Sequence, residues 1–330
     1  MEICKTDIYF KYEYGKLHEK IDKGVCELFR FENEKGAIQN LFIKRPIPVE
    51  INGLQYYDII SPYGFGGPII VKKQNDSVTS ELVRDYSIAF ADFCRENRIV
   101  SEFVKFNPVM NNAKDFWDIY HPEFSKNTVG IDLRYDDPVR AEFTKRKREY
   151  IRQALRRGIS YRIIEKPDDL SSFKKIYYET MERNDARDYY FFGDEYFEQC
   201  SEVLRDNILL IEAVYQENTI AAEMYLLFEK TMHFHLGGTL NEYYNLSPTS
   251  VMRYAATIWG KEKGYELIHQ GGGIGATAED KLYLSKKNFG MNTEFEYYVS
   301  KKIWDDDMYA KLCLTKNIIA TGKGYFPEYR

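Results

Sequence analysis

The sequence predicts a mixed α/β fold (α+β, with mixed sheets) in two successive units of similar plan. Short runs of β-branched and aromatic residues stand between Gly, Pro and Asn residues, which is typical of strands and turns. Longer segments carry apolar residues at helical spacing. The order of strands and helices is similar in both halves, although no direct sequence repeat is visible.

Length and composition indicate a soluble globular protein of more than one domain. The chain has 330 residues, of which 44% are hydrophobic and 29% charged, so disordered, collagen-like and coiled-coil proteins are excluded. Lys and Arg number 46 and Asp and Glu 51, which gives a net charge of −5. This balance argues against a protein that coats DNA but is compatible with a local basic face.

The cysteines and the N-terminus set expectations for metal binding and location. The five cysteines are widely spaced and form no C-x-x-C pair, which excludes a zinc ribbon and argues against a secreted disulfide scaffold. The first residues, MEICKTDIYF, carry charges too early for a signal peptide, and no apolar run reaches the ~18 residues that span a bilayer. We therefore expect a cytoplasmic protein without a membrane span.

The first unit is expected at residues 1–137. The segment SPYGFGGP, residues 61–68, is too rich in Gly and Pro for a regular element and is expected to form a shaped loop. Residues 79–97 have the apolar spacing of an amphipathic helix. Strands are expected at residues 25–31, 37–43, 57–60, 69–71, 99–106 and 128–133.

The sequence DDP at residues 136–138 indicates a boundary and the start of a second unit at residues 138–303. Residues 140–157 form the densest charge run of the chain, strongly basic with an apolar stripe, and Gly158 ends the expected helix. Two interpretations of this helix stay open: a solvated charged face, or a surface that contacts the phosphates of a tRNA.

The second unit repeats the plan of the first and ends in a glycine-rich turn. Its expected elements are a strand at 159–164, helices at 170–184 and 193–205, strands at 209–214, 219–228 and 231–236, a helix at 250–264 and a strand at 267–269. A last helix is expected at 304–319.

Two histidines, His233 and His235, lie in HFHLGGT, a predicted strand that ends in paired glycines. Strand alternation places both on one face and Phe234 and Leu236 on the other. Because no Asp, Glu or Cys stands beside them at ligand spacing, we expect no metal. A hydrogen-bonded histidine and a general base at His235 are the two remaining interpretations.

The segment NLSPTSVMR, residues 245–253, is an expected helix start. Ser247 or Thr249 can cap this helix, and its first backbone N–H groups, with Ser250 and Arg253, would attract a phosphate or carboxylate. An ordinary capped helix without a ligand is the alternative.

A glycine-rich segment, GGGIG at residues 271–275, precedes DKLYLSKKNFG at residues 280–290. Glycines let a ligand approach the backbone closely. The segment is neither a dinucleotide fingerprint, which opens a helix with G-x-G-x-x-G, nor a phosphate loop, because no G-K-[ST] follows.

Taken in order, the histidine strand, the Ser/Pro helix start, WGKEKG at 259–264, the glycine-rich segment and DKLYLSKKNFG resemble the FemAB-like branch of the GNAT acyltransferase superfamily. DIYFKYEYGKLHE at 7–19 and SPYGFGGPI at 61–69 are similar to that family too, so the resemblance covers nearly the whole chain. It implies tandem GNAT-like domains that face each other across a cleft, with the C-terminal helix, residues 304–330, packed back on the first domain.

The resemblance also implies a reaction and a donor site. The family moves an acyl or aminoacyl group from a thioester or an aminoacyl-tRNA to an amine. Lys286 matches its functional lysine, which would stabilise negative charge on the donor phosphate or the tetrahedral intermediate, although Ser285 replaces the usual aromatic residue before it. The donor is expected to bind at the place of the family's pyrophosphate loop, whose glycines are missing here, through Ser247, Thr249, Ser250 and Arg253.

One family feature is missing. The cell-wall aminoacyltransferases carry an Arg four residues before a Tyr, where it binds the acceptor's phosphates, whereas Phe192 precedes Tyr196 here. Arg183 and Arg187 are near in sequence, and either can substitute. The missing Arg and the missing coiled-coil insertion shift the expected function towards the acetyltransferase-type members, with an acyl-CoA such as acetyl-CoA as co-substrate and no tightly bound cofactor.

The acceptor and the base are the last expected parts of the site. By family position, the acceptor is expected to contact Tyr63, Phe65 and Gly66 of the loop at 61–68. Arg183, as a substitute for the missing Arg, and Tyr243, which follows the histidine strand and can line the cleft or protonate the leaving group, complete the expected set. Glu223 is a carboxylate in an apolar strand, where burial would raise its pKa towards that of a general base. A structural, hydrogen-bonded Glu223 is the alternative.

We therefore predict a bacterial N-acyltransferase of cell-envelope biogenesis. It would move an acyl group from acyl-CoA to the amine of a small molecule, such as an amino sugar or a cell-envelope precursor. The predicted catalytic residues are Lys286, Glu223 and His235. Two alternatives stay open: an aminoacyl-tRNA-dependent peptidoglycan-bridge aminoacyltransferase, and a non-catalytic module of the same fold that binds a sugar nucleotide.

Overall fold

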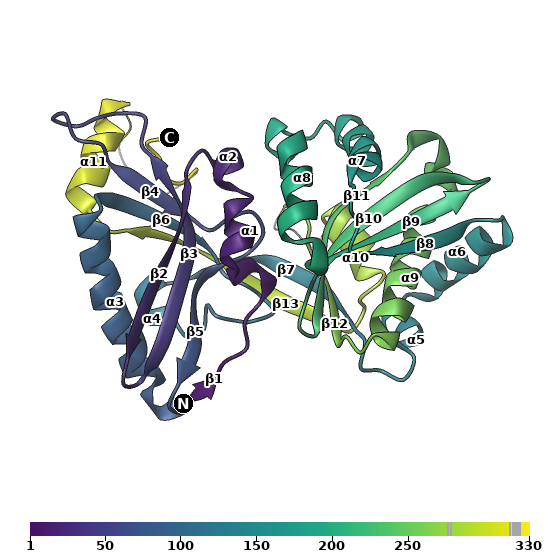
Figure 1. Cartoon of the computed structure of the whole chain (residues 1–330), viewed down its shortest axis with the longest axis horizontal. Helices are drawn as coiled ribbons and strands as arrows, with labels where there is room; N and C mark the ends of the chain where they lie inside the picture. Colours follow the sequence, from purple (N-terminus) through teal and green to yellow (C-terminus); the bar gives the residue numbers. More distant parts are fainter. Residues whose placement is uncertain (276, 278, 317, 319–324) are drawn as a thin grey trace. The chain divides into compact units, whose positions relative to one another are not determined.

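Two compact units make up the computed structural model, which describes residues 1–275, 277, 279–316, 318 and 325–330. The first unit contains Met1–Ser125 and Tyr297–Arg330, and the second is Lys126–Glu296. Each unit combines helices with a sheet (Figure 1). The predicted mixed α/β fold is therefore confirmed.

The borders between the units differ from those expected at residues 137 and 303. β7 (Glu123–Asp132) pairs with β12 (Leu267–Gly272), so the strand predicted at 128–133 belongs with the second unit. The second half of β13 (Glu294–Ile303) pairs with β6 (Ile99–Lys105) and returns the chain to the first unit. Long-range strand pairing, which local sequence does not reveal, sets both borders.

The sheet of the first unit has the strand order β1, β5, β3, β4, β6, β13, and β2 also pairs with β3. β4 and β6 are parallel, and the other pairs are antiparallel. The strands not yet given are β1 (Glu2–Ile3), β2 (Val25–Asn33), β3 (Gly36–Pro46), β4 (Tyr57–Ile60) and β5 (Gly67–Lys73).

One long helix, α3 (Thr79–Glu96), covers this sheet, as its apolar spacing predicts. Its buried Leu82, Tyr86 and Phe90 pack in a cluster with residues of the strands. The shorter helices of the unit are η1 (Ile8–Phe10), α1 (Tyr12–Lys16), α2 (Glu19–Asp22), η2 (Asp76–Val78) and α4 (Trp117–Tyr120).

The C-terminal helix, α11 (Asp306–Thr315), is shorter than predicted. Asp305 accepts a hydrogen bond from the N–H of Met308 and caps the helix, so Trp304 lies outside it. Residue 319, the predicted end, lies outside the described residues. Buried Tyr309 and Leu312 of α11 pack in one cluster with Val100 of β6, within the first unit.

The sheet of the second unit has the strand order β7, β12, β11, β10, β9, β8. β11 (Thr231–Thr239) and β12 are parallel, and the remaining pairs are antiparallel. The other strands are β8 (Ser160–Glu165), β9 (Ile208–Tyr215) and β10 (Asn218–Phe228).

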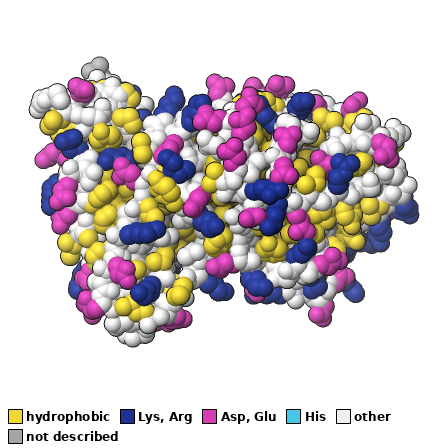
Figure 2. Space-filling view, in the orientation of Figure 1, with side chains coloured by type: hydrophobic (Ala, Val, Ile, Leu, Met, Phe, Trp, Pro, Cys, Tyr) yellow, Lys and Arg dark blue, Asp and Glu magenta, His cyan; other side chains and the backbone are white. Residues whose placement is uncertain are grey.

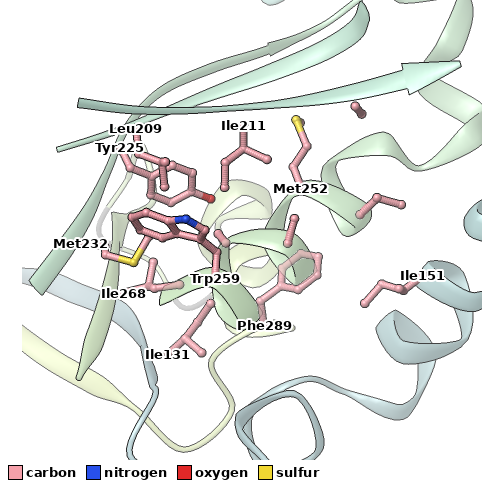
Figure 3. Close-up of a cluster of buried hydrophobic side chains, with 14 of the residues drawn as sticks. Ile131, Ile151, Leu209, Ile211, Tyr225, Met232, Met252, Trp259, Ile268 and Phe289 are labelled. Carbon is pink, nitrogen blue, oxygen red and sulfur yellow. The ribbon is translucent and has the colours of Figure 1, made fainter. Parts of the chain in front are cut away.

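Helices and a tight apolar core support this second sheet. The predicted basic helix is divided into α5 (Pro138–Glu142) and α6 (Lys145–Arg156), because Thr144 leaves helical geometry and caps α6 with its hydroxyl. Trp259 and Met252 of α9 (Pro248–Glu262) pack with Ile211 and Tyr225 of the sheet (Figure 3). The other helices are α7 (Ser171–Arg183), η3 (Asp188–Tyr190), α8 (Asp194–Val203), η4 (Arg205–Asn207), η5 (Asn241–Leu246) and α10 (Lys281–Lys287).

Candidate active site

The two parallel strands of the second unit separate part-way along their length. β11 and β12 pair only from Thr231 to His233 and from Leu267 to His269. Beyond these residues β12 pairs with β7, while β11 continues beside β10. In the ladder between β10 and β11, His235 has no partner residue, because the register shifts there in a β-bulge. A separated strand pair next to a bulge exposes backbone to a ligand and places side chains that a regular sheet would not bring together.

A buried ion pair lies beside this separation. Nε of Arg253, on α9, is 3.2 Å from Oε1 of Glu223, on β10, and both side chains are at most 5% exposed. The hydroxyl of Tyr225 donates to the other oxygen of Glu223 at 2.5 Å. Burial raises the pKa of Glu223, and Arg253 and Tyr225 oppose that shift. Both carboxylate oxygens therefore have partners.

Arg253 also has a hydrogen-bond donor without a partner among the described residues. The carbon of its guanidinium group lies 3.9 Å from the centre of the Phe234 ring. Its Nη1 is buried and has no hydrogen-bond partner among the described residues. Because buried polar groups are nearly always hydrogen-bonded, an unpaired guanidinium nitrogen indicates a place for an acceptor oxygen.

Lys286 approaches the same aromatic ring from α10. Its Nζ is 5.8 Å from the centre of the Phe234 ring and donates to the carbonyl oxygen of Gly272 at 2.7 Å. Burial, helped by the positive charges of Arg253 and Lys126, lowers the pKa of Lys286 to about 7. Two cations thus flank Phe234 with Glu223 beside them, and an anion would add compensating charge.

The glycine-rich turn places Lys286. Asp280 caps α10 by accepting from the N–H of Tyr283, and it also accepts from the N–H of Gly275. A Cβ on Gly273 would lie 2.3 Å from Oδ1 of Asp280, so a side chain at this position would displace the carboxylate. Asp280 thereby links the turn to the start of α10, the helix from which Lys286 reaches the carbonyl of Gly272.

His235 lies on the opposite face of the sheet from Glu223. Its Nε2 is 2.6 Å from the hydroxyl of Tyr196, on α8. A Cβ on Gly237 would touch Glu223, which faces α9, whereas one on its neighbour Gly238 would touch Ile176 of α7. Since successive residues of a strand point to opposite faces, α9 and α7 cover different faces of the sheet. The two predicted proton acceptors are therefore separated by the sheet.

The two histidines of β11 have different partners. His233 faces His269 of β12, with their Nδ1 atoms 3.4 Å apart, and His235 contacts Tyr196. The expected strict alternation is wrong at Leu236, because the bulge at His235 interrupts it. Within the described residues, no group of three or more His, Cys, Asp or Glu side chains is arranged to hold a metal ion.

The predicted donor residues divide into two pairs. Ser250 and Arg253 are buried, three residues apart on the inner side of α9, while Ser247 and Thr249 are partly exposed. Ser247 stands at the helix start with φ of 58° and its side chain makes no capping hydrogen bond. The predicted Ser/Thr cap is wrong, because this left-handed backbone does not direct the hydroxyl at the first turn.

The predicted acceptor residues of the second unit contact the ends of two strands, Arg183 at β11 and Tyr243 at β9. Nη1 of Arg183 donates to the carbonyl of Thr239 at 2.7 Å and to Asn241. The ring of Tyr243 packs against that of Tyr215 with centres 6.2 Å apart. Phe192, at the position of the missing Arg, is buried and stacks on Tyr196 at 4.6 Å.

The predicted acceptor residues of the first unit form part of an aromatic cluster. The hydroxyl of Tyr14 donates to the carbonyl of Tyr63 at 2.7 Å. The ring of Phe65 meets that of Tyr9 edge to face at 5.3 Å. Gly66 donates its N–H to the carbonyl of Lys105 at 2.6 Å. The two N-terminal segments that carried the family resemblance therefore pack on each other.

Sequence reasoning missed Tyr225 and Phe234 as parts of this site. Tyr225 stands two residues after Glu223 on a predicted strand, and that spacing places both side chains on one face. The sequence therefore contained a signal for Tyr225. It contained none for the position of Phe234 between Arg253 and Lys286, because that position depends on the packing of α9 and α10 around β11.

Comparison with known families identifies the second unit. Residues 141–279 match the family model described as the acetyltransferase (GNAT) domain. The second unit contains a GNAT acetyltransferase domain. The match covers Glu223, His235 and Arg253 and ends before Lys286, so the lysine lies in the segment that follows the matched part of the GNAT domain.

Solved structures share the fold of the whole chain. FemX is 13% identical with a TM-score of 0.68, and the alignment covers 94% of this chain and 95% of FemX. The C-terminal domain of a protein assigned as a lysylphosphatidylglycerol synthetase, from Agrobacterium fabrum, is 11% identical with a TM-score of 0.58, covering 92% and 95%. L-PGS from Bacillus licheniformis is 12% identical with a TM-score of 0.53, covering 96% and 98%.

The family match confirms the predicted resemblance to GNAT acyltransferases for the second unit, and the whole chain shares the fold of FemX. At these identities the structural likeness shows the fold and leaves donor and acceptor to other arguments. No protein with curated function matches the chain in sequence. In the described part of the chain, no helix is both long enough and apolar enough to cross a membrane.

Proposed function

We propose that the second unit transfers an acyl group from an acyl-CoA thioester to an amine. The observation that carries this proposal is the separation of β11 from β12 beside two basic side chains: Arg253, which is paired with Glu223, and Lys286, which lies at the other side of Phe234. In the reaction the amine nitrogen bonds to the carbonyl carbon, the carbon–sulfur bond breaks, and the thiol leaves. Because acyl-CoA is a cytoplasmic co-substrate, we place the reaction in the cytoplasm.

Arg253 and Lys286 have the charge that this reaction requires. Negative charge develops on the carbonyl oxygen of the tetrahedral intermediate, and preorganised donors there are worth several kcal/mol. The unpaired Nη1 of Arg253 and the Lys286 ammonium support such a role. Glu223 then acts as a positioning residue that holds Arg253, since both of its oxygens have partners.

The proton of the attacking amine needs an acceptor. An amine in the gap between β11 and β12 would have Arg253 and Lys286 on one face of the sheet and the pair His235–Tyr196 on the other, where the pair can take the proton. The hydroxyl of Tyr196 lies 2.6 Å from Nε2 of His235, so a proton taken by the phenol oxygen can pass on to the imidazole. Tyr196→Phe would break this path while keeping the ring stacked on Phe192. We expect a fall in kcat with little change in thioester affinity.

The acceptor is proposed to be an amino sugar or a cell-envelope precursor. The resemblance of the chain's sequence segments to the FemAB-like family supports this class of acceptor. We also infer that the first unit is a second GNAT-like domain and that Tyr63, Phe65 and Gly66 contribute to the acceptor's surroundings. In the second unit, Arg183 and Tyr243 are the corresponding candidates.

Calorimetry with acetyl-CoA and free CoA tests the donor. We expect saturable binding that Arg253→Ala and Lys286→Ala weaken and that Lys281→Ala leaves unchanged, because Lys281 is exposed on the same helix as Lys286. Folding of each variant is checked by circular dichroism. Absence of CoA binding by the wild-type protein, or equal binding by all variants, would contradict the proposal.

A second donor, an aminoacyl-tRNA, is favoured by the basic helix. α6 and the residue after it expose cations: Lys145, Arg146, Arg152, Arg156 and Arg157. Figure 2 shows Lys and Arg side chains at the side of the second unit where Figure 1 places α6. Contacts with several phosphates predict tRNA binding that weakens steeply with salt. Salt-insensitive or absent binding of charged tRNA would remove this donor.

A further inference from the structure

The first unit has a long strand edge without a strand partner. β2 pairs with β3 from Val25 opposite Lys44 to Asn33 opposite Gly36, without a register shift. No other described strand pairs with β2, which lies beside β3 in the N-terminal unit of Figure 1. Natural proteins usually shorten, bulge or cover such edges, because an open edge can pair with another chain. β2 is nine residues long and regular.

Cys26 establishes which backbone groups of β2 point outward. Its N–H donates to Oε1 of Glu19 at 2.7 Å, and its carbonyl accepts from the hydroxyl of Tyr12 at 3.5 Å. Both groups therefore point away from β3. In an antiparallel pair the outward residues alternate, so the N–H and carbonyl groups of Leu28, Arg30 and Glu32 point outward as well. Side chains cover this edge at Cys26, whereas the outward backbone groups of the next three positions have no hydrogen-bond partner among the described residues.

A groove runs along the open part of the edge. Its volume is about 720 Å³, and it is lined by residues of β2, by Tyr12 and Glu13 of α1, and by Phe93 of α3. Neighbouring strands in a sheet lie about 4.8 Å apart, so an added strand would lie between α1 and the end of α3. The groove and the outward backbone groups thus coincide.

The side chains around the groove indicate what an added strand would carry. Phe29 faces α3, with its ring 5.0 Å from that of Phe93, and Leu28 packs on the other face of the sheet. Arg30 and Glu13 are exposed and form no ion pair with the described residues, whereas Glu27 pairs with Lys44 at 3.5 Å. Apolar residues opposite Phe29 and Leu28, an acidic one opposite Arg30 and a basic one near Glu13 would be complementary.

We propose that β2 is a docking edge for an extended segment of a partner protein, which joins the sheet as an antiparallel strand. Backbone hydrogen bonds to Leu28, Arg30 and Glu32 would supply affinity, and the apolar and charged positions would supply specificity. The antiparallel direction fixes the order in the partner: the acidic residue precedes two apolar residues, and the basic residue follows them. This surface belongs to the first unit and does not depend on the proposed transferase reaction.

The probe is the capped, fluorescently labelled peptide Thr-Glu-Val-Val-Thr-Lys, and the measurement is fluorescence anisotropy with the full chain. We expect saturable binding that Arg30→Glu weakens about fivefold, since an opposite-charge cross-strand pair is worth up to about 1 kcal/mol. Exchanging the peptide's Glu for Lys should restore affinity for Arg30→Glu. The matched control is Arg95→Glu, because Arg95 is an exposed cation of α3 that does not line the groove.

A second peptide separates strand addition from simple apolar contact. N-methylation of alternate residues removes the backbone donors that face β2 and keeps every side chain, so we expect its binding to be lost. No saturable binding of the unmodified peptide, or equal binding of the methylated one, would overturn the proposal. Concentration-dependent dimerisation in sedimentation that Arg30→Glu abolishes would assign the edge to a second copy of this chain and overturn it too.

Discussion

Arg253 and Glu223 form an ion pair with 3.2 Å between Nε and Oε1, and the two side chains are 5% and 3% exposed. One comes from α9 and the other from β10. Tyr225 completes the coordination of the carboxylate, while Nη1 of Arg253 keeps no partner among the described residues. The pair therefore fixes the position of the Arg253 guanidinium group, and we propose that its Nη1 is the donor that a ligand would use.

Loss of the carboxylate should destabilise the second unit. In Glu223→Gln the charge of Arg253 would stay buried without a counter-charge, and breaking a buried ion pair costs about 3–5 kcal/mol. Urea unfolding measures the free energy. Glu262→Gln, at an exposed position of α9, should change it by less than about 0.5 kcal/mol. Equal stability of Glu223→Gln and wild type would show that the pair is not a structural requirement.

Lys286→Ala should reduce transfer while preserving the fold. Loss of one charge-stabilising donor typically lowers kcat by about 10²–10³, and the side chain is held by the Gly272 carbonyl rather than by a core contact. Steady-state kinetics with acetyl-CoA and an amine that the enzyme acetylates would measure the effect. Lys281→Ala is the control. Unchanged turnover would remove Lys286 from the site.

Stability should rise with pH because of Lys286. Its pKa in the folded protein is about 7, against 10.5 ordinarily, so between these values the unfolded state binds more protons than the folded state. The unfolding free energy therefore increases with pH across that window. Denaturation at several pH values should give a smaller increase for Lys286→Met than for wild type. Parallel curves would mean that the lysine titrates normally.

Glu102, in the first unit, should have the opposite effect at lower pH. It is buried and accepts from Asn40, Tyr120 and the indole of Trp304, and burial raises its pKa to about 7 from 4.5. The folded state then binds more protons between those values, so stability falls as pH rises across them. Glu102→Gln should flatten this dependence. An unchanged slope would place the titration elsewhere.

A side chain on Gly273 should disturb the cap of α10. Its Cβ would meet Asp280 at 2.3 Å, which would displace the cap of α10 and with it Lys286. We expect Gly273→Ala to lower transfer activity with a smaller effect on global stability. Gly193→Ala is the control, because nothing lies within 4 Å of its Cβ. Full activity of Gly273→Ala would show that the turn adapts.

The order of the family's segments and the choice of Lys286 as a candidate follow from local sequence. The GNAT-like order of segments is readable because each segment has its own signal: alternation in HFHLGGT, a helical stripe before WGKEKG, and glycines before DKLYLSKKNFG. Glu223 is recognisable as a carboxylate in an apolar run, and its burial follows from that pattern. Lys286 rests on the match to a family motif, and its pKa requires neighbours that the motif does not contain.

By itself the sequence determined the fold class, the family resemblance and the residue types of the candidate site. Only the tertiary structure decided that β7 belongs to the second unit, that Arg253 faces Glu223 rather than the helix start, and that His235 lies on the opposite face. The reason is physical. Local patterns report which face of an element is apolar, whereas strand partners, a bulge at His235 and charge pairs between distant elements depend on contacts across the chain.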